Sequence, residues 1–306
     1  MAANPDLSQI VPTLKEIPFP TRFAVELCAE CNLKCTMCHH SMMQRPKGVM
    51  PMALWKKCAE EVAATAPSTQ VWFSFCGEPL LEPELLLRML AYGREIGLKS
   101  MHLNTNGMFL SAELVAPLLD AGLRQIVIGL DGFSPRTYES IRVGGRREIV
   151  YGNVERLLTA RRARADGPEI MVQFIVMDEN EHELGAFRDY WLARGATVKV
   201  RHKLSWGGKL DTPLCVPIEE RIPCPWAVTM MHVFWDGRVP RCPGDTEGDE
   251  GAGNAWHESL ATLWGRLGSY RNLHLQHEFE ALPKRCQTCR DWMVGAAERV
   301  RPGGAA

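Results

Sequence analysis

The sequence RFAVELCAECNLKCTMC, residues 22–38, joins a short β-type run to three cysteines with the spacing CxxxCxxC. These are Cys31, Cys35 and Cys38, and they follow the run directly. Three thiolates at this spacing can hold one soft metal cluster, but they leave one iron of a four-iron cluster without a protein ligand. A cluster that takes part in a reaction requires such an open iron, because an external ligand can bind there. A structural zinc site would instead take a fourth ligand, which Cys28 or His39 could supply.

The run before these cysteines is the first of six β-type runs, and helical patterns separate them. The runs cover residues 22–27, 71–75, 100–105, 125–129, 169–176 and 197–201, and the helical segments cover 52–66, 83–96, 111–121, 147–164 and 182–194. Strands that alternate with helices pair in parallel through right-handed crossovers. Six units are too few for a closed eight-unit barrel, so the sequence predicts an α/β fold, a partial (β/α)6 barrel. Its functional residues should gather at the carboxyl ends of the strands.

The composition argues against several classes of protein. The chain has 306 residues, with 35 Lys and Arg against 36 Asp and Glu, and this balance argues against a nucleic-acid partner, which would call for a basic excess. No apolar run approaches the roughly 18 residues that a membrane span needs, and the first residues lack the basic start and apolar core of a signal peptide. We therefore expect a cytoplasmic protein. Its 11 cysteines should stay reduced there, which favours metal or redox chemistry over disulfides.

A second group of cysteines lies beyond the expected barrel, at Cys224, Cys242, Cys286 and Cys289. Residues 228–234 and 239–242, joined by a turn at Asp236-Gly237, are typical of a β-hairpin, and helices are expected around 260–270 and 274–281. Four thiolates satisfy a metal completely. The residues alone do not separate zinc from a four-cysteine iron–sulfur cluster.

The cysteine triplet, with the hydrophobic Met37 before its last member, resembles the radical S-adenosylmethionine superfamily. The resemblance implies that Cys31, Cys35 and Cys38 bind a 4Fe–4S cluster whose open iron chelates S-adenosylmethionine, and that Met37 lies near the adenine. An electron from the cluster, supplied by a flavodoxin- or ferredoxin-type donor, would cleave the cofactor to a 5′-deoxyadenosyl radical. That radical would abstract hydrogen from an unactivated C–H bond.

Further motifs occur in the order that this family has them. Residues 76–79, Cys-Gly-Glu-Pro, are similar to the family's Gly-Gly-Glu-Pro turn, and residues 104–107 carry its Thr-Asn-Gly segment. Residues 129–132 resemble Ser-x-Asp-Gly with Gly129 in place of the serine, for which Arg142 would compensate at the cofactor's carboxylate. Strand alternation adds Gln173 as a cavity residue. The expected cofactor-binding residues are Met37, Cys76, Gly77, Glu78, Asn106, Asp131, Arg142 and Gln173.

The second cysteine group resembles the auxiliary domain of the SPASM/twitch subgroup. Its C-x12-G-x4-C pattern precedes a CxxC pair, and no cysteine follows Cys289. This implies the shorter twitch form, with one auxiliary 4Fe–4S cluster on Cys224, Cys242, Cys286 and Cys289 and hence two clusters in all. The expected parts are an N-terminal extension (1–21), the barrel (22–202), a connection (203–223), the small C-terminal twitch domain (224–292) and a tail (293–306).

Twitch proteins of this size resemble the enzymes that modify aminocyclitols and aminoglycosides. We therefore expect hydrogen abstraction from a hydroxyl-bearing carbon of a small polar substrate, a sugar or aminocyclitol, that ends in oxidation or epimerisation. Cys215, which neither cluster needs, is the candidate hydrogen donor for epimerisation. Three alternatives stay open: a peptide-modifying radical enzyme, a zinc-ribbon binding module and a simple electron carrier.

Overall fold

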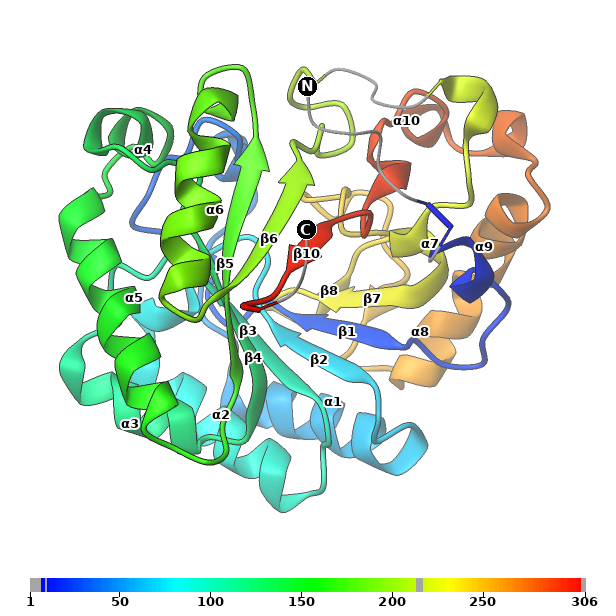
Figure 1. Cartoon of the computed structure of the whole chain (residues 1–306). Helices are drawn as coiled ribbons and strands as arrows, with labels where there is room; N and C mark the ends of the chain where they lie inside the picture. The colour runs from blue at the N-terminus through cyan, green and yellow to red at the C-terminus, as the bar shows by residue number, and fades with distance from the viewer. Residues whose placement is uncertain (1–6, 9, 213–216, 304–306) are drawn as a thin grey trace.

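The computed structural model describes residues 7–8, 10–212 and 217–303, and its centre is one curved eight-stranded sheet (Figure 1). The strand order is β10-β6-β5-β4-β3-β2-β1-β7. Strands β1 to β6 pair in parallel in chain order, which confirms the expected α/β partial barrel. The strands are β1 (Arg22–Val25), β2 (Gln70–Phe73), β3 (Met101–Thr105), β4 (Leu123–Gly129), β5 (Glu169–Val176), β6 (Thr197–His202), β7 (Met230–Val233) and β10 (Glu298–Val300).

Helices follow the barrel strands and lie on the outer side of the sheet in Figure 1. They are α1 (Met52–Thr65), α2 (Pro83–Glu95), α3 (Ala112–Asp120), α4 (Pro135–Ile141), α5 (Arg147–Arg162) and α6 (Leu184–Ala193). Helix α4 was not expected, although Ser134 caps it by accepting a hydrogen bond from the Thr137 backbone N–H. The apolar residues Leu54, Cys58 and Val62, spaced four apart along α1, are all buried.

Strand alternation divides the sheet into a packed face and a cavity face. On β2, Val71 and Phe73 are fully buried in the hydrophobic core, whereas Gln70 and Trp72 line a cavity inside the sheet. The same alternation on β6 sends Val198 and Val200 into the core and Lys199 and Arg201 into the cavity. The fold therefore presents polar residues of distant segments to one interior space.

One expectation for the C-terminal third, the hairpin, is wrong. The chain does turn at Asp236-Gly237, but β7 pairs in parallel with β1, and β8 (Arg238–Val239) pairs with β9 (Gly253–Asn254), so the hairpin does not form. The expected tail contains β10, which pairs antiparallel with β6. The main sheet thus extends beyond residue 202 at both edges, and both added strands come from the C-terminal region.

The remaining elements pack beside the β1 and β7 edge of the sheet (Figure 1). They include α7 (Pro225–Thr229), α8 (Leu260–Arg266), α9 (Gly268–Leu275) and α10 (Lys284–Gln287), and they surround a smaller apolar core with Trp226, Leu282 and Trp292. None of the helices in the described part of the chain has the length and apolar character needed to span a membrane.

Candidate active site

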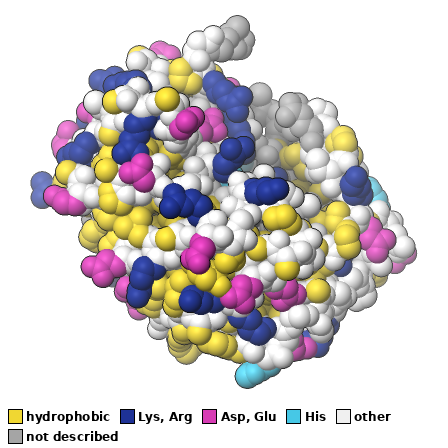
Figure 2. Space-filling model, turned by 90° about the horizontal axis from the view of Figure 1, so that it is seen from below, with side chains coloured by type: hydrophobic (Ala, Val, Ile, Leu, Met, Phe, Trp, Pro, Cys, Tyr) yellow, Lys and Arg dark blue, Asp and Glu magenta, His cyan; other side chains and the backbone are white. Residues whose placement is uncertain are grey.

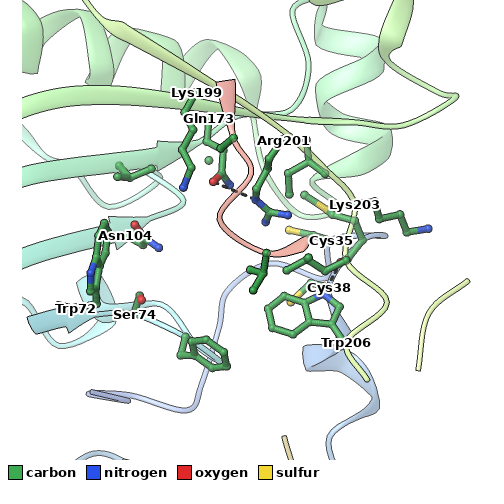
Figure 3. A pocket seen from close by; sticks show the side chains of 18 of the residues that line it. Cys35, Cys38, Trp72, Ser74, Asn104, Gln173, Lys199, Arg201, Lys203 and Trp206 are labelled. Atoms are coloured by element: carbon green, nitrogen blue, oxygen red, sulfur yellow. Dashed lines mark hydrogen bonds between the residues drawn. The ribbon is translucent and has the colours of Figure 1, made fainter. Parts of the chain in front are cut away.

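A cavity of about 360 Å³ lies inside the curved sheet, and it extends from Arg22 and Gln70 at the starts of β1 and β2 to the loops that follow the carboxyl ends of the strands. This is within the range of small-molecule sites. Figure 3 shows Trp72, Ser74 and Asn104 on one wall and Gln173, Lys199 and Arg201 on the opposite wall. The cysteine triplet and seven of the eight expected cofactor residues also line the cavity, namely Cys31, Cys35, Cys38, Met37, Cys76, Gly77, Glu78, Asn106, Arg142 and Gln173.

Backbone hydrogen bonds hold the loop of the triplet against the segment after α4. The Lys34 N–H donates to the carbonyl of Val143 at 2.8 Å, and the Thr36 N–H donates to that of Ile141 at 3.0 Å. Side chains then reach two of the sulfurs: Arg142 Nη1 lies 3.7 Å from Cys35 Sγ, and Asn106 Nδ2 lies 4.0 Å from Cys31 Sγ. The loop therefore presents its thiols beside hydrogen-bond donors, which favour the thiolate form.

The donor set suits an iron–sulfur cluster. Burial raises the pKa of Cys31 to about 12 and that of Cys38 to about 11, so a positive metal must compensate before these thiols ionise. No three His, Cys, Asp or Glu side chains in the described ranges form a group that would hold a single metal ion. One tetrahedral zinc draws its thiolates closer together than a four-iron cube does.

The turn after β2 places a buried carboxylate beside the triplet. Glu78 Oε1 accepts a hydrogen bond from the Thr105 hydroxyl at 2.7 Å, and Oε2 accepts one from the Asn106 N–H at 2.7 Å. Burial raises the pKa of Glu78, and these two donors oppose that effect. A Cβ on Gly77 would lie 2.0 Å from the carbonyl oxygen of Cys28, so only glycine fits where this turn meets the triplet loop.

Asp131 is fully buried and is not among the described residues that line the cavity, although a place in the lining was expected. It forms an ion pair with Arg142 and accepts a hydrogen bond from the Ile175 N–H at 2.7 Å. Burial alone would lower the pKa of Arg142, but Asp131 and Cys35 raise it overall. Asp131 therefore acts on the site through Arg142, which it holds charged and in place.

Arg142 occupies the space that a side chain at position 129 would need. A Cβ on Gly129 would lie 2.1 Å from Arg142 Nη2. The glycine that departs from the family's Ser-x-Asp-Gly motif is thus what lets the guanidinium reach the cavity. The expected role of Arg142 at the cofactor's carboxylate stays a prediction.

Further contacts connect the side chains that line the cavity. Trp206 donates from Nε1 to the carbonyl of Met37 at 3.0 Å and packs on His39, with ring centroids 4.3 Å apart. Arg201 donates to Gln173 Oε1 at 3.2 Å, shown as a dashed line in Figure 3. Cys76 Sγ lies 3.6 Å from His39 Nε2, so a thiol outside the triplet also lines the cavity. Cys215, the expected hydrogen donor, lies outside the described residues.

The four later cysteines lie within electrostatic reach of one another, and Cys224 and Cys286 belong to the smaller apolar core. Burial raises the pKa of Cys224 and of Cys242 to about 12. The Tyr270 hydroxyl lies 3.3 Å from Cys286 Sγ, and the Asp291 N–H donates to Cys289 Sγ at 3.4 Å. Trp226, close in sequence to Cys224, lines the cavity as well. The second cysteine group therefore adjoins the wall of the candidate active site.

The chain has relatives among characterised and uncharacterised proteins. It is 25% identical to an uncharacterised protein of Treponema pallidum over 89% of this chain and 79% of that one. It is 32% identical to an AdoMet-dependent heme synthase of Methanosarcina barkeri over 40% of this chain and 34% of the relative. It is 26% identical to an S-adenosyl-L-methionine-dependent 2-deoxy-scyllo-inosamine dehydrogenase of Niallia circulans over 42% and 53%. The last two matches thus leave much of each relative uncovered.

Two solved structures share the fold over most of the chain. BtrN in complex with AdoMet and 2-DOIA has a TM-score of 0.65 at 20% identity, covering 90% of this chain and 94% of BtrN. Streptococcus suis SuiB bound to precursor peptide SuiA has a TM-score of 0.70 at 13% identity, covering 93% and 72%. At these identities the likeness concerns the fold alone, and at that level the expected SPASM/twitch architecture is confirmed.

Residues 25–190 match the sequence model of the Radical SAM superfamily. This match covers more than half of the chain, and it spans the triplet, the turn at residues 76–79 and Arg142. The chain therefore belongs to the radical SAM superfamily, whose members bind S-adenosylmethionine and a 4Fe–4S cluster.

Proposed function

We propose that this radical SAM enzyme removes a hydrogen atom from a hydroxyl-bearing carbon of a small polar substrate, a sugar or cyclitol, and that the reaction ends in oxidation or epimerisation. The observation that carries the proposal is that one cavity joins three thiols to polar side chains of β2, β3, β5 and β6. The triplet and these polar side chains therefore face the same space.

Cys31, Cys35 and Cys38 would hold the cluster, and Arg142 would receive the carboxylate of S-adenosylmethionine. When bound, cluster and cofactor together supply the reductive cleavage that generates a hydrogen-abstracting 5′-deoxyadenosyl group, with the electron coming from a flavodoxin- or ferredoxin-type partner. The chain's own part is positional: Asp131 holds Arg142, and the buried Glu78 fixes the turn beside the triplet. Trp206 covers the loop at Met37 and helps to exclude water.

Cys224, Cys242, Cys286 and Cys289 are proposed as the ligands of a second 4Fe–4S cluster in a twitch domain at residues 224–292. Oxidation of an alcohol requires that the substrate, after loss of one hydrogen atom, lose a further electron and a proton. A fully ligated group beside the cavity wall at Trp226 could take that electron. Epimerisation would instead need a hydrogen donor, and Cys215 and Cys76 are the two candidate thiols.

The likeness to BtrN and to the dehydrogenase of Niallia circulans supports a cyclitol-type substrate. The likeness to SuiB, whose structure contains a precursor peptide, supports a peptide as the second candidate. A sugar and a peptide are distinguished by the product, since a peptide-modifying enzyme would act on a precursor chain and leave free sugars untouched.

Anaerobic reconstitution tests the core of the proposal. The loaded chain should contain about eight iron and eight sulfide, and with dithionite it should convert S-adenosylmethionine to 5′-deoxyadenosine and methionine. Cys31→Ala should abolish this cleavage, whereas Cys58→Ala, a buried cysteine of α1, should retain it. Zinc without sulfide, or cleavage that survives Cys31→Ala, would overturn the proposal.

Product analysis in deuterated solvent separates the two outcomes of the reaction. Deuterium at a stereocentre indicates epimerisation by a thiol, and either Cys215→Ala or Cys76→Ala should then block turnover. A ketone without solvent deuterium indicates dehydrogenation, in which case neither thiol is needed for hydrogen return. Cys286→Ala should then stop product formation while cleavage of S-adenosylmethionine continues.

A further inference from the structure

Two strands of the sheet bring like charges face to face inside the cavity. In the antiparallel pair of β6 and β10, Lys199 lies directly opposite Arg299. Both side chains line the cavity. Like charges at directly opposed positions of a strand pair destabilise that pair, so this arrangement calls for a compensating group.

Two more arginines join them. Arg22 at the start of β1 and Arg201 on β6 also line the cavity, and a Cβ on Gly295 would lie only 4.0 Å from Arg22 Nη1, so the segment before β10 reaches the start of β1. We call Arg22, Lys199, Arg201 and Arg299 the basic cluster. Repulsion from its other members lowers the pKa of Lys199, after the larger effect of burial.

Among the described residues, no free carboxylate of the cavity lining balances the basic cluster, and the carboxylates that act favourably on Arg201, Asp131 and Asp291, lie outside the lining. Glu78 is the only acidic side chain among the described residues that line the cavity, and its two oxygens are already engaged by Thr105, Asn106 and the Leu80 N–H. None of the four cations forms an ion pair within the described ranges. The face of the molecule shown in Figure 2 intersperses both signs of charge.

The opposite wall has the character of a polar binding surface. Asn104 Oδ1 is buried without a hydrogen-bond partner in the described part of the chain, and Figure 3 shows Asn104 across the cavity from Lys199. Trp72 lies beside it and stacks on His102, with ring centroids 4.3 Å apart. A polar ligand whose charged end meets Lys199 would thus also find an unused acceptor and an aromatic surface.

We propose that the basic cluster binds an anionic group of the substrate, a phosphate monoester or a carboxylate. Arginine offers paired N–H donors that match both groups, and lysine adds a compact charge. The inference deepens the proposed function and rests on it, since it takes this cavity as the substrate site. It favours a phosphorylated or carboxylated sugar over one that carries a free ammonium group near these four cations.

Binding of simple probes to the cluster-loaded protein tests this without turnover. Isothermal titration calorimetry, with saturating S-adenosylmethionine and no reductant, would compare glucose 6-phosphate, glucuronate, glucose and glucosamine. Because the cofactor's own carboxylate is already bound, it cannot account for the signal. The wild type should bind one of the two anionic probes at least about ten-fold more tightly than glucose, and glucosamine least tightly. Tighter binding of glucose 6-phosphate indicates a phosphate site, and tighter binding of glucuronate indicates a carboxylate site.

Lys199→Gln and Arg299→Gln should each weaken binding of the preferred anion by about ten-fold or more. Lys99→Gln, which removes an exposed cation outside the cavity, is the matched control and should leave it unchanged. Arg299 is exposed, so its variant keeps the test valid if Lys199→Gln folds poorly. Equal binding of charged and neutral probes, or an anion preference that both variants retain, would overturn the inference. Loss of S-adenosylmethionine cleavage would overturn the proposed function without altering this readout.

Discussion

Position 129 shows how a single residue fixes the geometry of the cofactor site. Because Arg142 Nη2 fills the space of a side chain there, Gly129→Ala should displace the guanidinium from the cavity. We expect affinity for S-adenosylmethionine to fall by about ten-fold, the equivalent of one charged hydrogen bond. Equilibrium dialysis against the cluster-loaded protein measures it. Gly152→Ala on α5, where a Cβ meets nothing within 4 Å, is the control, and equal affinity in both variants would contradict this role of Arg142.

Lys199 should make stability depend on pH. Burial, with repulsion from Arg201, Arg299 and Arg22, lowers its pKa from 10.5 to about 7. Between these values the unfolded chain binds the proton that the folded chain has lost, so stability rises with pH across this window, and below about pH 7 the full penalty applies. The difference in Tm between wild type and Lys199→Met should therefore shrink from about pH 7 to about pH 10. A difference in Tm that stays constant with pH would show that folding does not lower the pKa of Lys199.

The residues that the sequence could and could not identify differ in one respect. The triplet, the turn at residues 76–79 and the Asp131 motif are short local patterns, and the structure places them together because parallel strands end at one edge of the sheet. The basic cluster is not local. Lys199 meets Arg299 only through the register of β6 and β10, and Arg22 joins them through the curvature of the whole sheet. No spacing along the chain signals that encounter.

At the scale of elements, the positions of the strands along the sequence were easier to predict than the strands with which they pair. The expected runs match β1 to β6 closely because at least one α-helix lies between each of these strands and the next. The turn at Asp236-Gly237 suggested a hairpin, and the Phe234 N–H does donate to the carbonyl of Arg238 at 2.9 Å. The pairing stops there, since β7 finds its partner in β1. The local sequence pattern around Asp236-Gly237 cannot show that β1 has a free edge with which β7 pairs.

A buried ion pair ties the loop after the triplet to the β1 and β7 edge. Arg45 pairs with Glu26, their side chains are 3% and 0% exposed, and Arg45 Nε also donates to the carbonyl of Thr246 at 2.8 Å. Arg45→Met should destabilise the fold by about 3–5 kcal/mol, because Glu26 would stay buried without a partner. Thermal unfolding of the cluster-loaded protein should show a drop in Tm of several degrees.

The double variant Glu26→Gln with Arg45→Met removes both charges and should recover most of that loss. The Trp235 N–H, which donates to Glu26 Oε2 at 3.1 Å, would still have an amide oxygen to bind. A double variant as unstable as Arg45→Met would show that the arginine contributes by packing on Phe234, over whose ring its guanidinium lies at 4.0 Å, and not by pairing charge.

At the scale of the whole molecule, the cysteine triplet and the C-terminal segment line the same cavity. Residues 293–297 and Arg299 follow the last cysteine and line the same cavity as the triplet, so the C-terminal segment completes a site that the barrel strands begin. β10 is held by β6 and by the ion pair of Arg188 with Glu298 at 3.1 Å. This edge strand has no second neighbour in the described sheet, so its removal should leave the other strand pairs intact.

A chain that ends at Val294 should therefore keep both cluster sites and lose the closed cavity. We expect about eight iron per chain, as in the full-length protein, because all seven proposed ligands are retained. Binding of the preferred anionic probe should weaken more than in Arg299→Gln, since the deletion removes the wall at residues 295–297 together with the charge. Calorimetry on the two proteins side by side measures this. An anion affinity equal to that of the full chain would place the substrate away from β10, whereas loss of iron would show that β10 supports the auxiliary site instead.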